Sequence, residues 1–188
     1  MKIFGRIVMP QHAPALLLTS LLTACGGSLP DGSLNPVQID AQIFSAELNG
    51  VQETPPNNSP AAGVGLAIVN AKDLSFSASV VTTGMTDTLA HIHEAPPNVA
   101  GPVVFPMTKE PGKVVWNVKG TLTPVQLDKM RAGGFYFNAH STTFPEGEIR
   151  GQIVFRLPTR DQLQRLSDVA QQSQVLQDLL QKARQQNP

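Results

Sequence analysis

Three of the four histidines in this chain could form a metal site. His91 and His93 lie in one strand-like segment and His140 lies in another. Because alternate side chains of a β-strand share a face, His91 and His93 should point the same way. Imidazole suits copper and zinc, and three protein ligands leave one coordination position open. We therefore predict a copper or zinc site of His91, His93 and His140, with nitrogens within about 4 Å of one another.

The sequence does not determine the fourth ligand of such a site. Asn138 would share a strand face with His140, and several acidic residues and methionines are further candidates: Glu94, Glu146, Glu148, Met85 and Met107. The alternative is structural, with the histidines hydrogen-bonded to loop backbone in a polar cluster with Asn138, Arg150 and Gln152. A copper-dependent redox enzyme is a third, weaker hypothesis, and no Ser-His-Asp or Cys-His pattern indicates other catalysis.

The N-terminus has the pattern of a secretory signal peptide over residues 1–24. Lys2 and Arg6 precede an apolar run, residues 15–22, that is too short to span a bilayer. The run leads into Leu22-Thr-Ala-Cys25, which resembles the lipobox of bacterial lipoproteins. The resemblance implies cleavage before Cys25, a lipid on its sulfur and, with Gly26 next, an outer-membrane destination. The alternative is an ordinary signal peptide followed by an unmodified cysteine.

Composition narrows the class of partner. The chain has 14 basic and 14 acidic residues, so removal of Lys2 and Arg6 would leave 12 against 14, a net charge near −2. No basic stripe is present, and we expect no nucleic-acid partner. Since Cys25 is the only cysteine, the chain can form no internal disulfide.

Period-2 patterns predict an all-β body over residues 41–157. Leu74, Phe76 and Ala78 alternate with serines, as in a one-sided antiparallel strand. Seven or eight such strands and one short helix, residues 123–133, predict an antiparallel Greek-key β-sandwich of immunoglobulin- or superoxide-dismutase-like type. Residues 25–40, rich in Gly, Ser, Pro and Asn, should form a flexible tether.

The last segment, residues 158–188, is predicted to be one amphipathic helix. Thr159 and Gln162 fit a capping box, and leucines then recur at helical spacing as far as Arg184, interrupted at Ser173. Its apolar stripe must be covered. Three alternatives stay open: docking onto the parent sandwich, self-association as a coiled coil, and contact with an envelope partner or the membrane surface.

Residues 46–153 resemble the CHRD (chordin) domain family. The resemblance rests on segments in the expected order: Ala46-Glu-Leu-Asn-Gly-Val-Gln-Glu-Thr-Pro-Pro56, Ala61-Ala-Gly-Val-Gly65, His91-Ile-His93, Gly101-Pro-Val-Val104, Tyr136-Phe-Asn-Ala-His-Ser141 and Pro145-Glu-Gly-Glu-Ile-Arg-Gly-Gln-Ile153. It implies a β-sandwich, in bacteria often on secreted or surface-anchored chains, and no settled activity. One departure is Glu94-Ala-Pro-Pro97, where the family commonly has Gly-Pro after the histidine pair.

His91-Ile-His-Glu94 also resembles a strand of copper–zinc superoxide dismutases. That enzyme's fourth mature histidine, cysteine pair and zinc loop are missing from this sequence, so dismutase activity is not expected. We predict a non-catalytic binding module, anchored in the bacterial cell envelope by a lipid on Cys25, that binds copper or zinc. The alternative is a metal-free structural or adhesive module that acts through its loops or its C-terminal helix, on another envelope protein or a second copy.

Overall fold

The computed structural model describes residues 40–186. The predicted signal peptide, Cys25 and all but the last residue of the predicted tether lie outside the described residues. The described part forms eight strands: β1 (Ala41–Asn49), β2 (Ala62–Asn70), β3 (Ser75–Thr83), β4 (Asp87–Glu94), β5 (Val103–Pro106), β6 (Val115–Thr121), β7 (Phe135–Ser141) and β8 (Ile149–Gln152). Its helices are α1 (Pro124–Arg131), α2 (Arg160–Asp168) and α3 (Gln174–Gln186), with 3-10 turns η1 (Gly50–Gln52) and η2 (Ala170–Gln172).

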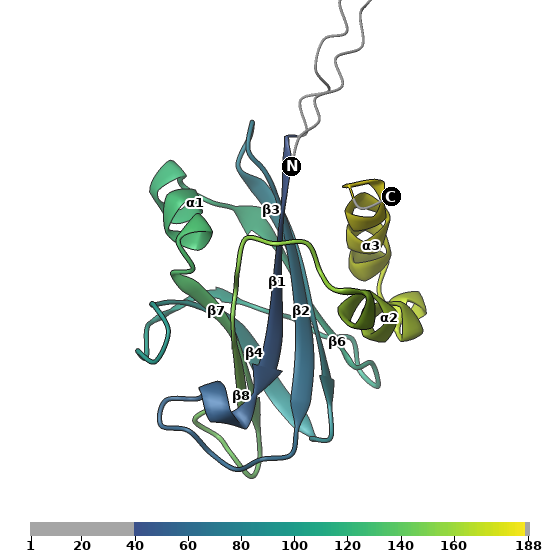
Figure 1. The fold of residues 1–188 in the computed structure, drawn as a ribbon. Coiled ribbons are helices and arrows are strands. Elements are labelled where there is room, and N and C mark those ends of the chain that lie inside the picture. The colour runs from purple at the N-terminus through teal and green to yellow at the C-terminus, as the bar shows by residue number, and fades with distance from the viewer. Residues whose placement is uncertain (1–39, 187–188) are drawn as a thin grey trace, which may run out of the picture. The chain divides into compact units, whose positions relative to one another are not determined.

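The eight strands form one antiparallel sheet in the order β5-β4-β7-β8-β1-β2-β3-β6 (Figure 1). The all-β prediction is therefore confirmed at the level of a predominantly antiparallel β-fold with three added helices. The Greek-key order and the likeness to immunoglobulin or dismutase sandwiches stay predictions. The short helix is confirmed as α1, where Thr123 and Gln126 form a capping box and Pro124 opens the first turn.

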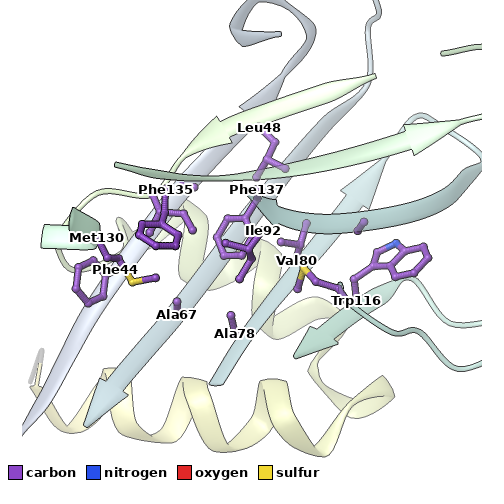
Figure 2. Close-up of a cluster of buried hydrophobic side chains, with 14 of the residues drawn as sticks. Phe44, Leu48, Ala67, Ala78, Val80, Ile92, Trp116, Met130, Phe135 and Phe137 are labelled. Atoms are coloured by element: carbon purple, nitrogen blue, oxygen red, sulfur yellow. The ribbon is translucent and has the colours of Figure 1, made fainter. Parts of the chain in front are cut away.

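The main core lies where the sheet folds over on itself. Side chains from β4 and β7, such as Ile92 and Phe137, pack against side chains from β1 to β3, such as Phe44 and Val80 (Figure 2). Gly65 on β2 shows how close the two layers come, because a Cβ there would lie 2.4 Å from the Phe137 ring. A glycine at this point makes room for the aromatic ring.

The strands β4 and β7 each bury one set of side chains in this core and present the alternate set on the opposite face. Ala90 and Ile92 of β4 belong to the core cluster, as do Phe135, Phe137 and Ala139 of β7. Because side chains alternate along a strand, His91 and His93 lie on the other face of β4, and Tyr136, Asn138 and His140 lie on the other face of β7. We call this surface of β4, β7 and β8 the histidine face.

The C-terminal segment differs from its prediction, because it forms two α-helices rather than one. The chain breaks at η2, and the Ser173 hydroxyl then accepts from the Leu176 N–H at 3.2 Å, a bond typical of a helix N-terminus. The same hydroxyl donates to Asn117 Oδ1 of β6 at 2.8 Å. Ser173 therefore both starts α3 and attaches it to the sheet.

The two helices cover β2, β3 and β6 (Figure 1). Leu166, Leu176, Leu179, Leu180 and Ala183 are buried among the sheet residues Ile43, Val64, Leu66, Ile68, Val81 and Val115. Of the three predicted alternatives for the apolar stripe, the structure shows docking onto the parent domain. No helix in residues 40–186 has the length and apolar character needed to cross a membrane.

Candidate metal site

Strand pairing brings the three histidines to neighbouring positions on the histidine face. His91 lies opposite Asn138, His93 opposite Tyr136, and Leu89 opposite His140 in the antiparallel pair of β4 and β7. The two residues of each pair lie on the same face of the sheet. The three histidines therefore belong to three successive pairs on that face, two of them from β4 and one from β7. The shared face of His91 and His93 follows from alternation along β4, and the pairing of β4 with β7 brings His140 beside them.

The ring nitrogens converge, although not to bonding geometry. Nδ1 of His91 lies 3.1 Å from Nε2 of His140. One nitrogen from each of the three rings lies within 4.8 Å of the other two. The predicted limit of about 4 Å is therefore met by the His91–His140 pair and exceeded by the set as a whole. Because nitrogens around a tetrahedral zinc are about 3.4 Å apart, the rings would have to close by up to about 1.4 Å to hold a single ion.

Two backbone carbonyls fix the orientation of His93 and His140. Nδ1 of His93 lies 2.8 Å from the Gly101 carbonyl oxygen, and Nδ1 of His140 lies 2.9 Å from that of Pro145. Since a carbonyl only accepts, each neutral ring carries its proton on Nδ1 and has a lone pair on Nε2. Metal-binding histidines are commonly oriented by such a bond from the second nitrogen.

The two Nε2 atoms that result have different surroundings. Nε2 of His140 faces Nδ1 of His91, which can donate a proton to it. Nε2 of His93 is buried and has no hydrogen-bond partner among residues 40–186. Buried polar atoms are nearly always paired, so an unpaired acceptor beside two other imidazoles is the most informative atom of the site.

Burial keeps the rings in the form that binds a cation. It lowers the pKa of His91 and His93, and the neighbouring His140 lowers both further. The hydrogen bond to Gly101 acts in the opposite direction on His93, and the Arg150 charge adds to the lowering. At neutral pH both rings are therefore uncharged, as a metal ligand must be.

Tyr136 and Gly101 support His93. The Tyr136 ring stacks on the His93 ring with centroids 4.8 Å apart and 13° between planes. The Tyr136 oxygen accepts from the Gly101 N–H at 3.1 Å. A Cβ at Gly101 would lie 2.1 Å from the Glu94 carbonyl oxygen, so only glycine allows this approach. From the sequence, Tyr136 and Gly101 were identified only as positions within the family motifs, without a role of their own.

Arg150 joins the histidine face to the loops that cover it. Its side chain is 2% exposed, and its guanidinium carbon lies 3.5 Å from the Tyr136 ring centroid. It donates to the Pro96 and Val99 carbonyl oxygens, at 3.1 and 3.0 Å. The predicted polar cluster therefore exists, but Arg150 reaches the histidines through Tyr136.

Glu53 is a member of this cluster that the sequence reasoning missed. Burial raises its pKa to about 7, although the Thr54 backbone, Arg150 and Asn138 all favour the charged form. Its Oε1 accepts from Asn138 Nδ2 at 2.6 Å. Since Glu53 lies in the loop after η1, far from the histidines in sequence, no local pattern could have placed it here.

Most of the predicted fourth ligands have other partners. Glu94 pairs with Lys129, and Glu148 accepts from Ser59 at 2.6 Å. Met107 is buried in the main core and Met85 packs against it. Among the described residues, the side chains close enough to share a metal ion are His91, His93 and His140. No carboxylate belongs to this group, so Glu146 is not part of it either. Asn138 is the only predicted candidate opposite a histidine.

Comparison with known proteins supports the family resemblance and adds no closer relative. The family model of the CHRD domain matches residues 44–153, which is more than half of the chain and includes all three histidines. No curated protein matches the chain, and neither does any solved structure. On its motifs and this match, the chain belongs to the CHRD domain family.

Proposed function

We propose that this protein is a non-catalytic, metal-binding module of the cell envelope, holding one zinc or copper ion with His91, His93 and His140. The observation that carries the proposal is the buried, unpaired Nε2 of His93 beside the paired nitrogens of His91 and His140. A cation bound there would satisfy this lone pair. Imidazole ligands favour zinc and copper over magnesium or calcium.

Each ring has a defined part in binding. His93 and His140 would bind through Nε2, because Gly101 and Pro145 hold their Nδ1 protons. His91 must change, since its Nδ1 is engaged with His140 in the metal-free arrangement. Its proton would move to Nε2, leaving a lone pair on Nδ1. An ion would then cross-link β4 to β7 in place of that hydrogen bond.

Binding rather than catalysis agrees best with the surroundings. Within residues 40–186, no carboxylate hydrogen-bonds to any of the three rings; their bonds are to Gly101, Pro145 and each other. A zinc hydrolase needs a general base beside the metal-bound water. The copper-dependent redox enzyme therefore stays the weaker hypothesis.

Metal titration tests the proposal. Residues 26–188, which include all described residues, would be titrated with Zn(II) and Cu(II) by calorimetry, beside the His91→Ala/His93→Ala/His140→Ala variant. We expect one ion per chain and a loss of at least about 100-fold in affinity in the variant, because all three ligands are removed. Leu89→Ala, an exposed change next to the site, is the matched control and should bind normally. Equal, weak binding by all three proteins would refute the site.

A metal-free structural module is the second candidate function. The specific observation in its favour is the His91–His140 contact, which already joins β4 to β7 without an ion. Under this alternative, the triple-alanine variant loses stability in the presence of a chelator, and added zinc stabilises neither protein. Under metal binding, zinc stabilises the unmodified chain alone.

We propose further that a lipid on Cys25 anchors the protein in the envelope, at the outer membrane. Family membership suggests an extracellular or envelope module, and the signal-like residues 1–24 followed by Cys25 support an anchor. Cys25→Ser should leave the precursor unprocessed or release the protein from the membrane fraction. A processed, membrane-bound Cys25→Ser protein would refute acylation.

A further inference from the structure

We infer that Asn138 supplies the fourth ligand of the histidine site through its side-chain oxygen, Oδ1. The inference rests on the proposed metal site and specifies its ligand set as three nitrogens and one oxygen. Four observations carry it: strand register, ring convergence, the anchored amide and a second unpaired atom.

Strand register places Asn138 in the middle of the site. Asn138 lies opposite His91, while His93 and His140 flank this pair on its two sides. Since His140 lies opposite Leu89, it is four residues from His93 along the strand direction, which is about 13 Å at 3.3 Å per residue. Their ligand nitrogens nevertheless lie within 4.8 Å. Both rings must therefore lean inward, over His91 and Asn138.

The amide of Asn138 is held in one orientation. Its Nδ2 donates to Glu53 Oε1 at 2.6 Å, and the side chain is only 4% exposed. Above about pH 7, where Glu53 is ionised and can only accept, the amide nitrogen of Asn138 points toward Glu53 and its oxygen points away from it. Glu53 thus fixes which atom of Asn138 remains available.

That oxygen is the second unpaired polar atom on the histidine face. Oδ1 of Asn138 is buried without a hydrogen-bond partner in the described part of the chain, as is Nε2 of His93. Both atoms are acceptors, and neither can satisfy the other. One cation bound by both atoms would satisfy both lone pairs, whereas no hydrogen bond within residues 40–186 satisfies either of them.

The chemistry of the fourth ligand bears on the choice of ion. An amide oxygen is a hard, neutral donor, whereas Cu(I) prefers soft sulfur ligands. A set of three imidazoles and one oxygen therefore favours a divalent ion, Zn(II) or Cu(II), over Cu(I). The methionines that could have favoured Cu(I) lie on the core side of the sheet.

The test removes the oxygen and measures both affinity and coordination. Asn138→Leu and Asn138→Ala would be compared with the unmodified chain at pH 8, using chelator competition for Zn(II) and visible absorption for Co(II). We expect zinc affinity to fall by at least about tenfold and the Co(II) bands to shift, because one ligand is replaced by solvent. Leu89→Ala, an exposed change beside the histidines, is the matched control and should bind normally.

A paired exchange separates a ligand from a purely structural asparagine. In Asn138→Asp/Glu53→Gln, the amide at position 53 can donate to one oxygen at position 138 and leave the other for the ion. We expect this double variant to recover the zinc affinity that Asn138→Leu loses, and to show Co(II) bands different from those of the unmodified chain, because a carboxylate oxygen replaces the amide oxygen as ligand. A role in loop attachment alone predicts the recovery without a change in the Co(II) bands.

Two outcomes keep the inference distinct from the proposed site. If folded Asn138→Leu or Asn138→Ala keeps the affinity and the Co(II) spectrum of the unmodified chain, Asn138 is not a ligand, although the histidine site stands. If zinc binding by the unmodified chain does not depend on the histidines, the site itself is refuted. A drop in affinity without recovery in the double variant would also overturn direct ligation.

Discussion

The two outer regions of this sheet are built in opposite ways. On β2, β3 and β6, apolar side chains are covered by leucines of α2 and α3. On the outer face of β4, β7 and β8, the side chains include an arginine, an asparagine and three histidines, and Glu53 from the loop after η1 accepts a hydrogen bond from that asparagine. Two acceptors there, Nε2 of His93 and Oδ1 of Asn138, are left unpaired.

The difference separates an apolar surface covered by helices from a polar surface that leaves two buried acceptors without partners among residues 40–186. Apolar residues docked on an apolar face gain free energy from burial alone. Polar residues taken from water gain little unless every donor and acceptor is paired. An incompletely paired cluster in an otherwise well-packed domain is where a ligand is expected.

The largest effect should come from the helix-covered face. Leu176 of α3 is fully buried, so Leu176→Ala should lower the free energy of unfolding by about 2–5 kcal/mol through lost burial and the cavity left behind. Zinc affinity should stay unchanged, because the histidines are on another part of the sheet. Urea denaturation and zinc titration of the same variant check both parts. A parallel fall in zinc affinity would mean that the two regions are not independent.

Arg150 should give the largest effect on the histidine face. Arg150→Leu removes donors to Pro96, Val99 and Thr54 and leaves those acceptors unpaired, so we expect a loss of about 2–4 kcal/mol in unfolding free energy. Arg150→Lys keeps the charge and loses the planar contact with Tyr136, and should recover only part of the loss. Full recovery by lysine would show that charge alone matters at this position.

Zinc should stabilise the protein through the histidine face. At a free zinc concentration 100 times the dissociation constant, the gain in unfolding free energy should be about 2.7 kcal/mol. The triple-alanine variant should show no gain, whereas Leu176→Ala should show the same gain as the unmodified chain. Thermal denaturation with and without zinc measures it. An equal gain in all three proteins would point to binding elsewhere.

Glu53 should make stability depend on pH. Its pKa is raised to about 7 in the folded chain from 4.5, so between these values the unfolded chain releases a proton that the folded chain keeps. The free energy of unfolding therefore falls as pH rises from about 4.5 to about 7, and this contribution is constant above.

Glu53→Gln isolates that effect. The variant should match the unmodified chain at pH 4 and exceed its unfolding free energy at pH 8 by about 1–2 kcal/mol, a value reduced from the full shift for solvent screening. Denaturant unfolding at the two pH values measures the difference. A variant less stable at pH 8 would show that the attraction between Glu53 and Arg150 outweighs the cost of burial.

The structural features that the sequence predicted correctly depend on local patterns. Period-2 alternation placed His91 and His93 on one face, and Thr123-Pro124 located α1, because both features involve neighbouring residues. The pairing of β4 with β7, which brings His140 to His91, joins residues distant in sequence and has no local signal.

Long-range contacts also explain where the predictions from the sequence were wrong or incomplete. Leucine spacing predicted one C-terminal helix, and the apolar pattern does continue through α2 and α3. The break lies between Asp168 and Gln174, where Ser173 caps α3 and also donates to Asn117 of β6, a contact that exists only in the folded domain. Likewise, Glu53 reaches the site only because its loop folds over β7 and β8.

The most direct test of the central claim is nitrogen NMR on chain labelled with ¹⁵N-histidine, before and after one equivalent of Zn(II). We predict that His93 and His140 carry their protons on Nδ1 without metal, and that zinc shifts Nε2 of both and Nδ1 of His91 together, at one ion per chain. Unchanged nitrogen resonances after zinc is added, or shifts confined to a single ring, would contradict a three-histidine site.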